Sequence, residues 1–466
     1  MATQTEAQAG TRAVVAYPET RLPLARTIAL GMQHVLAMFG ATVLAPIIMG
    51  FNPSLAILFS GVGTLLFILI TRGRVPSYLG SSFAFIAPVI AAKAEGGIPA
   101  ALGGIIAAGV VYGIIGLIVM RTGVGWIEYL MPPVVTAAVV AVIGLALAHV
   151  AVDLAARNVW LAALSFSLAA LIAVGTRGFP RLIPILLGAV IAYIVALVTG
   201  NVDLAPIRQA AWIGVPDFVT PTFNLRAISL IAPVALVLVA ENAGHIKALS
   251  AQMDRNLMPY LGRGFLGDAV GTVVSAFGGG TGQTTYAENI GVMAMTRVYS
   301  IYVFVAAALT AIVLGFSPKF GAVIGSIPPG VMGGLAILLF GLIAATGGKI
   351  IRDGRVDFAQ PRNLIVLGST LAIGVGSAAL EWAHTTVLNT LLNNNLPLGA
   401  LDRVPTGTLN VGTGNFSFAL GNIALATFVA IAVNQVLALV ERFGAQKAPS
   451  TRREAVQDRT VHEVRA

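Results

Sequence analysis

The chain has 466 residues, of which 57% are hydrophobic and only 10% are charged. Soluble domains carry about 25% charged residues, so this composition excludes an ordinary soluble protein and predicts an all-α polytopic membrane protein. The net charge of +9 could indicate a nucleic-acid partner, but basic cytoplasmic loops explain it more simply, and we expect no nucleic acid. The chain has no cysteine, which excludes disulfides and thiolate metal sites.

In chain order, apolar stretches predict about fourteen transmembrane helices, each near the roughly 20 residues that cross a bilayer. The predicted spans are 27–48, 54–71, 78–92, 100–120, 131–151, 159–176, 181–200, 227–248, 264–277, 282–296, 298–316, 327–347, 363–380 and 416–440. The third and tenth are the short ones. The longest connection is the polar stretch 381–415, and residues 1–26 and 441–466 are predicted to be tails.

The basic residues predict the orientation of these spans. With a cytoplasmic N-terminus, 22 of the 28 lysines and arginines fall on segments that face inward. Cytoplasmic loops of membrane proteins carry such an excess. One missed span would invert every later segment, so the asymmetry favours an even number of spans with both termini in the cytoplasm.

Two pairs of short motifs indicate an internal repeat. Met-Pro-Pro at 131–133 and Ile-Pro-Pro at 327–329 open the fifth and twelfth spans, 196 residues apart. Ser81 to Phe85 in the third span matches Thr284 to Glu288 in the tenth, 203 residues later. A unit of seven spans must reinsert upside down, which gives an inverted repeat. Paired interrupted segments at corresponding places are typical of a transporter's binding site.

Three acidic residues lie inside the predicted spans, namely Glu241, Asp268 and Glu288. Ionisable residues within a membrane are costly and indicate function by default. His245 lies four residues after Glu241 on the same helical face, where the two side chains can share a hydrogen bond. Glu288 follows the glycine-rich run that starts at Gly278, which predicts a broken helix with unpaired N–H groups at its start.

These features together predict the kind of ligand. Carboxylates accept hydrogen bonds, half-helix N-termini donate them, and Phe83, Phe85 and Tyr286 offer flat faces. A nucleobase is small, planar and neutral, with N–H and C=O groups along its edge. An inorganic anion would need a basic residue, which this site lacks. Because a low dielectric favours the protonated form of a carboxylic acid, such an acid could carry a proton together with the substrate.

The run Glu288-Asn289-Ile290-Gly291, followed after four residues by Thr296-Arg297, resembles the signature of the nucleobase–ascorbate transporter family, also called nucleobase:cation symporter-2. The resemblance is strongest to bacterial uracil and pyrimidine permeases. It extends from about Leu22 to Arg442, through the motifs QHVLAMFGATVLAP, PSYLGSSFAFIAP, AENAGH and TTYAENIGVMAMTRVYS. These motifs are long and specific.

The resemblance implies fourteen spans in a seven-plus-seven inverted repeat, with short β-like stretches and half-helices in segments 3 and 10. It implies a core domain formed by 27–121 and 227–316, and a gate domain formed by 122–200 and 327–440. It also implies a multi-pass homodimer in the bacterial inner membrane that moves core against gate in an elevator-like step driven by protons. No cofactor or metal is expected beyond the coupling proton.

Carried over by position, the family pattern implies that Glu241 and Glu288 hold the edge of the base. Backbone groups at Phe83 and Ala287 complete the site, and His245 tunes Glu241, so that Glu241, His245 and Glu288 couple transport to protons. Uracil permeases of the family have glycine at the position of Ala287. Alanine keeps the backbone N–H, but its methyl group could narrow the pocket. Purine carriers often have glutamine at the position of Glu288, so the glutamate favours a pyrimidine.

Plainer interpretations stay open for several residues. His34 is expected to be a hydrogen-bonded core residue, and Asp268 to act at a helix end or in a conformational step. Tyr286 is as consistent with packing as with a binding role, and Phe83 favours the site. His245 is as consistent with orienting Glu241 as with moving protons.

The predicted function is therefore import of a nucleobase, most readily uracil, through the lipid bilayer with protons. A xanthine or uric acid carrier of the same fold is the nearest alternative, followed by a passive facilitator. A membrane enzyme is disfavoured, because the glycine-rich run lacks the GK[ST] of a phosphate loop and Glu241 and His245 lack the second histidine of a zinc-protease helix.

Overall fold

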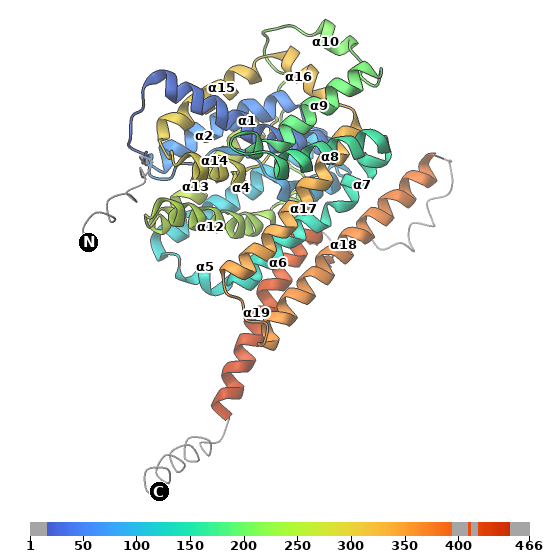
Figure 1. The fold of residues 1–466 in the computed structure, drawn as a ribbon. Helices are drawn as coiled ribbons and strands as arrows, with labels where there is room; N and C mark the ends of the chain where they lie inside the picture. The colour runs from blue at the N-terminus through green and yellow to red at the C-terminus, as the bar shows by residue number, and fades with distance from the viewer. Residues whose placement is uncertain (1–15, 394–408, 412–417, 448–466) are drawn as a thin grey trace, which may run out of the picture.

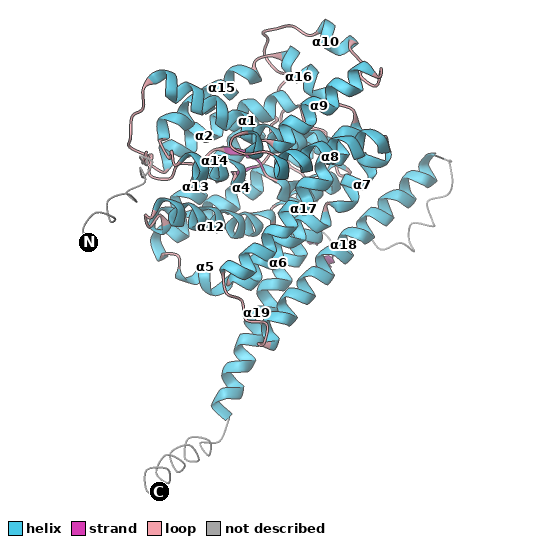
Figure 2. Cartoon of the chain, in the orientation of Figure 1, coloured by secondary structure: helices cyan, strands magenta, loops and turns pink. Residues whose placement is uncertain are grey.

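The computed structural model describes residues 16–393, 409–411 and 418–447, which are largely helical (Figures 1 and 2). The α-helices are α1 (Leu24–Met49), α2 (Pro53–Ile70), α3 (Ile86–Lys93), α4 (Gly97–Thr122), α5 (Gly125–Leu130), α6 (Pro133–Ala146), α7 (Ala148–Ala156), α8 (Val159–Gly175), α9 (Pro184–Val198), α10 (Ala205–Gln209), α11 (Leu225–Ile231), α12 (Val234–Met253), α13 (Leu261–Phe277), α14 (Ala287–Thr296), α15 (Ile301–Gly315), α16 (Pro318–Gly325), α17 (Pro329–Asp353), α18 (Pro361–Asn393) and α19 (Asn422–Lys447). Short 3-10 helices are η1 (Phe83–Phe85), η2 (Pro180–Leu182) and η3 (Met258–Tyr260), and the strands are β1 (Leu79–Ser81), β2 (Gln283–Thr285), β3 (Leu409–Val411) and β4 (Phe418–Leu420).

Every predicted span overlaps a helix, but the helices differ in length. Within the described ranges, eight are long and apolar enough to cross a membrane, or nine if α15 and α16, which meet at 83°, form one span. The prediction of a helical protein with many potential membrane crossings is confirmed. The count of fourteen crossings stays a prediction, because segments such as α3 and α14 are too short to cross alone.

The third and tenth segments meet at the centre of the fold. β1 and β2 pair antiparallel, with Leu79 opposite Thr285 and Ser81 opposite Gln283. Two equivalent threonines on the flanking helices accept from the first N–H group of each strand: Thr64 Oγ1 of α2 accepts from Leu79 at 2.9 Å, and Thr272 Oγ1 of α13 accepts from Gln283 at 3.0 Å. Non-helical backbone at membrane depth is tolerated where such partners are supplied.

Helices pack around this strand pair in an exchanged pattern, in which each half of the chain packs on the other. The helix before β2, α13, packs on α4, which follows β1, and α15, which follows β2, packs on α2, which precedes β1. A second group consists of α17 packed on α6, α7 and α8, with α18 on α6 and α19 (Figure 1). Close approach relies on small residues: a Cβ on Gly267 would lie 2.7 Å from the Phe67 ring, and one on Gly104 would lie 2.8 Å from the Ala227 carbonyl oxygen.

The predicted connection and the predicted C-terminal tail both begin as helix. α18 runs on to Asn393 and α19 to Lys447, and both project from the helical body (Figure 1). The first residues of the predicted connection 381–415 and of the predicted tail 441–466 are therefore helical, and their polar residues lie on the projecting ends of these two helices. Residues 394–408 and 412–415 of the connection lie outside the described residues, and so do residues 448–466 of the tail.

The predicted N-terminal tail also contains a packed segment. The Ala16 N–H donates to the Arg297 carbonyl oxygen at 3.1 Å, and Glu19 pairs with Arg255 at 2.9 Å. The Arg255 guanidinium also lies 3.7 Å from the centre of the Tyr17 ring. A backbone hydrogen bond and the Arg255 charge hold the pKa of Glu19 below its usual value. This segment joins the α12–α13 connection to the α14–α15 connection.

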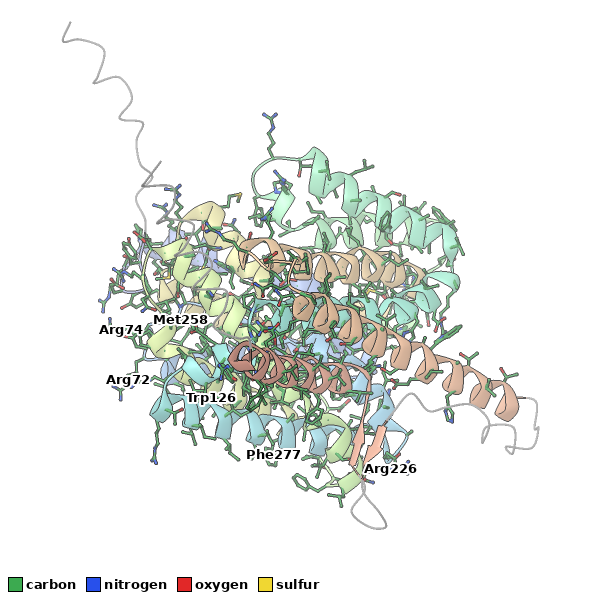
Figure 3. All side chains as sticks on the ribbon, turned by 90° about the horizontal axis from the view of Figure 1, so that it is seen from below. Arg72, Arg74, Trp126, Arg226, Met258 and Phe277 are labelled. Carbon is green, nitrogen blue, oxygen red and sulfur yellow. The ribbon has the colours of Figure 1, made fainter. Side chains whose placement is uncertain are left out.

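Three arginines mark the two ends of the helical body, while the orientation in the membrane stays a prediction. In Figure 3, Arg72 and Arg74 lie at one end of the body together with Trp126 and Met258, and Arg226 lies toward the opposite end. The distribution of basic residues predicts that Arg72 and Arg74 face the cytoplasm and that Arg226 faces the opposite side.

Candidate functional site

The strand pair places two half-helices head to head. One residue follows each strand before its half-helix begins: η1, which continues into α3, starts at Phe83 after β1, and α14 starts at Ala287 after β2. The Ser82 hydroxyl caps the first half-helix by accepting from the Ala84 N–H at 3.3 Å, whereas the Tyr286 side chain does not cap α14. The N-cap side chain therefore leaves the first N–H groups of α14 uncapped, although the Glu288 carboxylate accepts a hydrogen bond from its own backbone N–H. The positive end of the helix dipole favours a hydrogen-bond acceptor there.

Both predicted carboxylates lie at this junction. α12 contacts η1, β2 and α14, which brings Glu241 beside Ser82 and close enough to Glu288 for the two charges to interact. The Glu241 Oε2 atom is buried and has no hydrogen-bond partner. A buried acceptor without a partner is costly, so this atom fits a site that a ligand or a proton completes.

The site opens along one face of each carboxylate helix. Ala287 is exposed, and a Cβ at Gly244 or Gly291 would meet no atom within 4 Å. Toward the C-terminal ends of both helices the same faces continue through the exposed residues Ala248, Ala251, Ala294 and Met295. Those ends are followed by Arg255 and Arg297, on the side that the sequence assigns to the cytoplasm.

The two predicted aromatic site residues are placed differently. Phe83 is 8% exposed, and its ring lies edge-on to Phe340 of α17, with centroids 5.9 Å apart. Tyr286 is buried, with its hydroxyl donating to the Ser81 carbonyl oxygen at 2.9 Å and accepting from Thr42 at 3.1 Å. Phe83 therefore lies where the two helix groups meet, while Tyr286 holds β1 against α1.

His245 begins a directed chain of buried hydrogen bonds. The Thr285 backbone N–H and hydroxyl both donate to Asn242 Oδ1, which fixes the amide orientation. Asn242 Nδ2 donates to the Tyr112 hydroxyl at 2.8 Å, and that hydroxyl faces Asp268 Oδ2 at 3.5 Å. Because the Thr285 proton is given to Asn242, the 2.9 Å contact from His245 Nδ1 must be a donation to Thr285. His245 Nε2 is then left as the acceptor.

A Thr285→Val substitution tests this direction. We expect the wild-type histidine to carry its proton on Nδ1, and the variant to lose that preference because the acceptor is gone. The unfolding free energy should fall by about 1–3 kcal/mol, since buried groups lose a partner. Nitrogen-15 chemical shifts of the histidine rings report the tautomer, with His245→Gln used to assign the signal.

Thr285→Ser is the matched control, because it keeps the hydroxyl and should restore the Nδ1–H form. A wild-type protein with its His245 proton on Nε2 would show that the chain runs the other way.

Asp268 and His34 lie away from the open part of the site. Asp268 is in the middle of α13 and fully buried, so the predicted helix-end position is wrong; its Oδ1 atom has no partner. His34 is confirmed as a hydrogen-bonded core residue: Asn289 Nδ2 donates to its Nδ1 at 3.0 Å. Asn289 thereby ties α14 to α1.

Sequence reasoning missed Asn242, Thr285, Tyr112 and Phe340. Asn242 adjoins Glu241 in the AENAGH motif, and the available signal was a polar amide side chain inside a predicted apolar span. Tyr112 and Phe340 come from α4 and α17 and carry no local pattern that indicates the site. In the described part of the chain, no group of three or more histidine, aspartate or glutamate side chains is arranged to hold a metal ion.

Residues 25–381 of the chain match the family Xan_ur_permease, which is described as a permease family. It is 49% identical over 443 residues to RutG of Escherichia coli (strain K12), covering 92% of this chain and 93% of that protein. It is 45% identical to the uracil permease of Bacillus caldolyticus, covering 81% and 94%, and 42% identical to the uracil permease of Escherichia coli (strain K12), covering 78% and 87%.

Two solved structures share the fold. Murine Slc26a9, an anion transporter in the inward-facing state, aligns with a TM-score of 0.64 at 9% identity, covering 91% of this chain and 69% of that chain. The transmembrane domain of the cyanobacterial bicarbonate transporter BicA aligns with a TM-score of 0.54 at 15% identity, covering 70% and 93%. At such identities the likeness concerns fold alone.

Proposed function

The chain belongs to the permease family called nucleobase:cation symporter-2, and from this premise we propose that it imports a nucleobase, with uracil favoured, together with a proton. It is a transporter and not an enzyme, and it is an integral multi-pass membrane protein. We place it in the bacterial inner membrane with both termini in the cytoplasm, in keeping with the distribution of basic residues.

The observation that carries the proposal is the meeting of two carboxylates with two half-helix N-termini. Uracil alternates N–H and C=O groups along its edge, so it can donate to Glu241 and Glu288 and accept from N–H groups at the start of α14. Phe83 offers a flat apolar face beside them. Ala287 would contribute its backbone N–H, and Tyr286 would support the site from behind by holding β1.

We assign proton coupling to Glu241, His245 and Glu288. The partnerless Glu241 Oε2 supports this assignment, because a buried carboxyl group is more readily tolerated when it is protonated. With Nδ1 donating to Thr285, His245 keeps Nε2 as an acceptor for a proton four residues after Glu241. In the proposed cycle, base and proton bind from outside and are released together on the inner side.

Movement of a core domain (27–121 and 227–316) against a gate domain (122–200 and 327–440) completes the mechanism. The exchanged packing of helices and the antiparallel β1–β2 pair support a seven-plus-seven inverted repeat of fourteen spans. The open faces of α12 and α14 support an inward-open arrangement of the site in this structure. A homodimer is part of the proposal on the family resemblance alone.

Uptake of labelled base tests the function. In a strain without its own permease, the chain should concentrate labelled uracil, and an uncoupler should abolish the accumulation. An excess of unlabelled uracil should compete, while xanthine and uric acid should not. Competition by the purines alone would show a purine carrier, equilibration without accumulation would show a facilitator, and accumulation that ignores an imposed pH gradient in vesicles would contradict proton coupling.

Ala287→Gly is expected to widen the substrate range. The lost methyl group is exposed in the site, and one such group is worth about 0.8 kcal/mol of contact, or roughly fourfold in affinity. We expect thymine, which adds a methyl group to uracil, to compete about fourfold better against the variant. Competition curves for thymine and uracil give the ratio, and Ala294→Gly, farther along the same face of α14, is the control. An unchanged ratio would remove Ala287 from substrate selection.

A further inference from the structure

A second polar pocket lies far from the strand pair, where α5, the start of α18 and the end of α19 meet. Its volume is about 460 Å³, and its lining includes Glu128, Tyr129, Arg362, Asn434 and Arg442. None of these residues belongs to the proposed transport site.

Two residues of the pocket lining each carry a buried polar atom without a hydrogen-bond partner, and the two atoms are of opposite kind. Asn434 is 3% exposed, and its Oδ1 atom, an acceptor, has no hydrogen bond. Arg362 Nε, a donor, is likewise buried without a partner, although its Nη1 atom pairs with Glu441 at 3.0 Å. A ligand that satisfies both atoms must carry an acceptor and a donor, because each unpaired buried group is costly.

The charges around the pocket have the same dual character. Glu128 and Glu441 are acidic, while Arg362 and Arg442 are basic, and all four line the pocket. The Arg442 guanidinium lies 5.6 Å from the centre of the Tyr129 ring, which also lines the pocket. The lining therefore suits a zwitterion better than a simple anion or cation.

The location identifies the zwitterion as part of an amphiphile. The apolar span of α18 begins at Pro361 and that of α19 ends at Phe443, so the pocket lies at the membrane boundary. Exposed apolar side chains continue from it along both helices: Leu364, Ile365, Val436, Leu439 and Val440. Trp126 of α5 lies at the same end of the body as Arg72 (Figure 3), as expected for an aromatic residue at a membrane interface.

We propose that this pocket binds the head group of a phospholipid that carries a primary amine, such as phosphatidylethanolamine. Its phosphate oxygens accept hydrogen bonds from Arg362 Nε and the Arg442 guanidinium. Its ammonium group donates to Asn434 Oδ1 and faces Glu128. Its acyl chains lie along the exposed apolar surface of α18 and α19. The site is independent of the transported substrate.

Lipid binding to the purified, delipidated full chain tests the proposal. Native mass spectrometry should show phosphatidylethanolamine binding at least fivefold more tightly than phosphatidylcholine or phosphatidylglycerol of the same acyl chains. Phosphatidylcholine lacks ammonium N–H donors, and phosphatidylglycerol lacks the cation. Soluble phosphoethanolamine should bind much more weakly, because it lacks the acyl chains.

Variants localise the site. Asn434→Leu and Arg362→Gln should each reduce the preference for phosphatidylethanolamine to below twofold, while Arg355→Gln, which changes an arginine outside the pocket, should keep it. Equal binding of the three lipids by the wild type overturns the proposal, as does preference for phosphatidylglycerol. Soluble phosphoethanolamine binding as well as the lipid would assign the pocket to a small molecule. The lipid ranking of the wild type decides even if a variant fails to fold.

Discussion

Replacing Glu241 with glutamine is expected to abolish concentrative uptake of uracil, with an initial rate at least about 100-fold below wild type. Glutamine keeps the size of the side chain but removes both the negative charge and the group that can carry a proton. A hydrogen bond to a charged group is worth about 1.5–3 kcal/mol, which corresponds to roughly 10- to 150-fold in binding. The lost proton site removes the driving force as well.

Two measurements separate these losses. Uptake driven by a pH gradient reports coupling, and exchange of labelled for unlabelled uracil at equal pH reports binding and movement alone. We expect exchange to survive weakly and coupled uptake to vanish. Glu381→Gln is the matched control, because Glu381 is a largely buried glutamate on α18 that accepts a hydrogen bond from Asn422, and glutamine can still accept it. Normal accumulation by the Glu241 variant would take Glu241 out of the mechanism.

Gly80→Ala is expected to destroy the site from behind. A Cβ on Gly80 would lie 2.5 Å from the Tyr286 ring and 2.7 Å from Thr42 Oγ1, and both of these residues are buried. Tyr286 would have to leave its hydrogen bond to Ser81, and the β1–β2 register would be lost with it. Overpacking of this kind costs typically about 1–3 kcal/mol. We expect uracil binding to be lost and the thermal midpoint to fall.

Calorimetry and uracil binding to the purified protein measure the two effects. Gly368→Ala on α18 is the control, since a Cβ there meets no atom within 4 Å and should leave both properties unchanged. A Gly80→Ala protein that binds uracil normally would show that the packing of Tyr286 against β1 is dispensable.

The sequence predicted the parts of the site that carry their own signal. Short interrupted segments at 78–92 and 282–296 and acids inside apolar spans are unusual in a membrane, so Glu241 and Glu288 could be identified without a fold. The i, i+4 spacing placed His245 on the same face as Glu241. All three residues lie on the helices that meet at the strand pair.

The remainder depended on contacts between distant segments. The short β-like stretches of segments 3 and 10 were expected from the family resemblance alone, because β1 and β2 are each three residues long and have no local pattern apart from their pairing. The direction of the His245 hydrogen bond depends on Asn242 and on Tyr112, which lies 130 residues before Asn242. The residues after Glu381 are polar and therefore predicted a connection, although α18 continues as helix to Asn393. Helix propensity alone is a weak signal, so the sequence did not indicate this extension.

The pairing of β1 with β2 also has a consequence for biogenesis. Ser81 of β1 lies opposite Gln283 of β2, about 200 residues later, so at about 5–20 residues per second the ribosome needs roughly 10–40 seconds to deliver the second strand after the first. During that interval the first half of the chain lies in the membrane with unsatisfied backbone groups at its centre. Newly inserted chains should therefore be cleaved most readily by membrane proteases before the second strand emerges. When the two halves are expressed as separate chains, each half should be degraded more slowly in the presence of the other than alone.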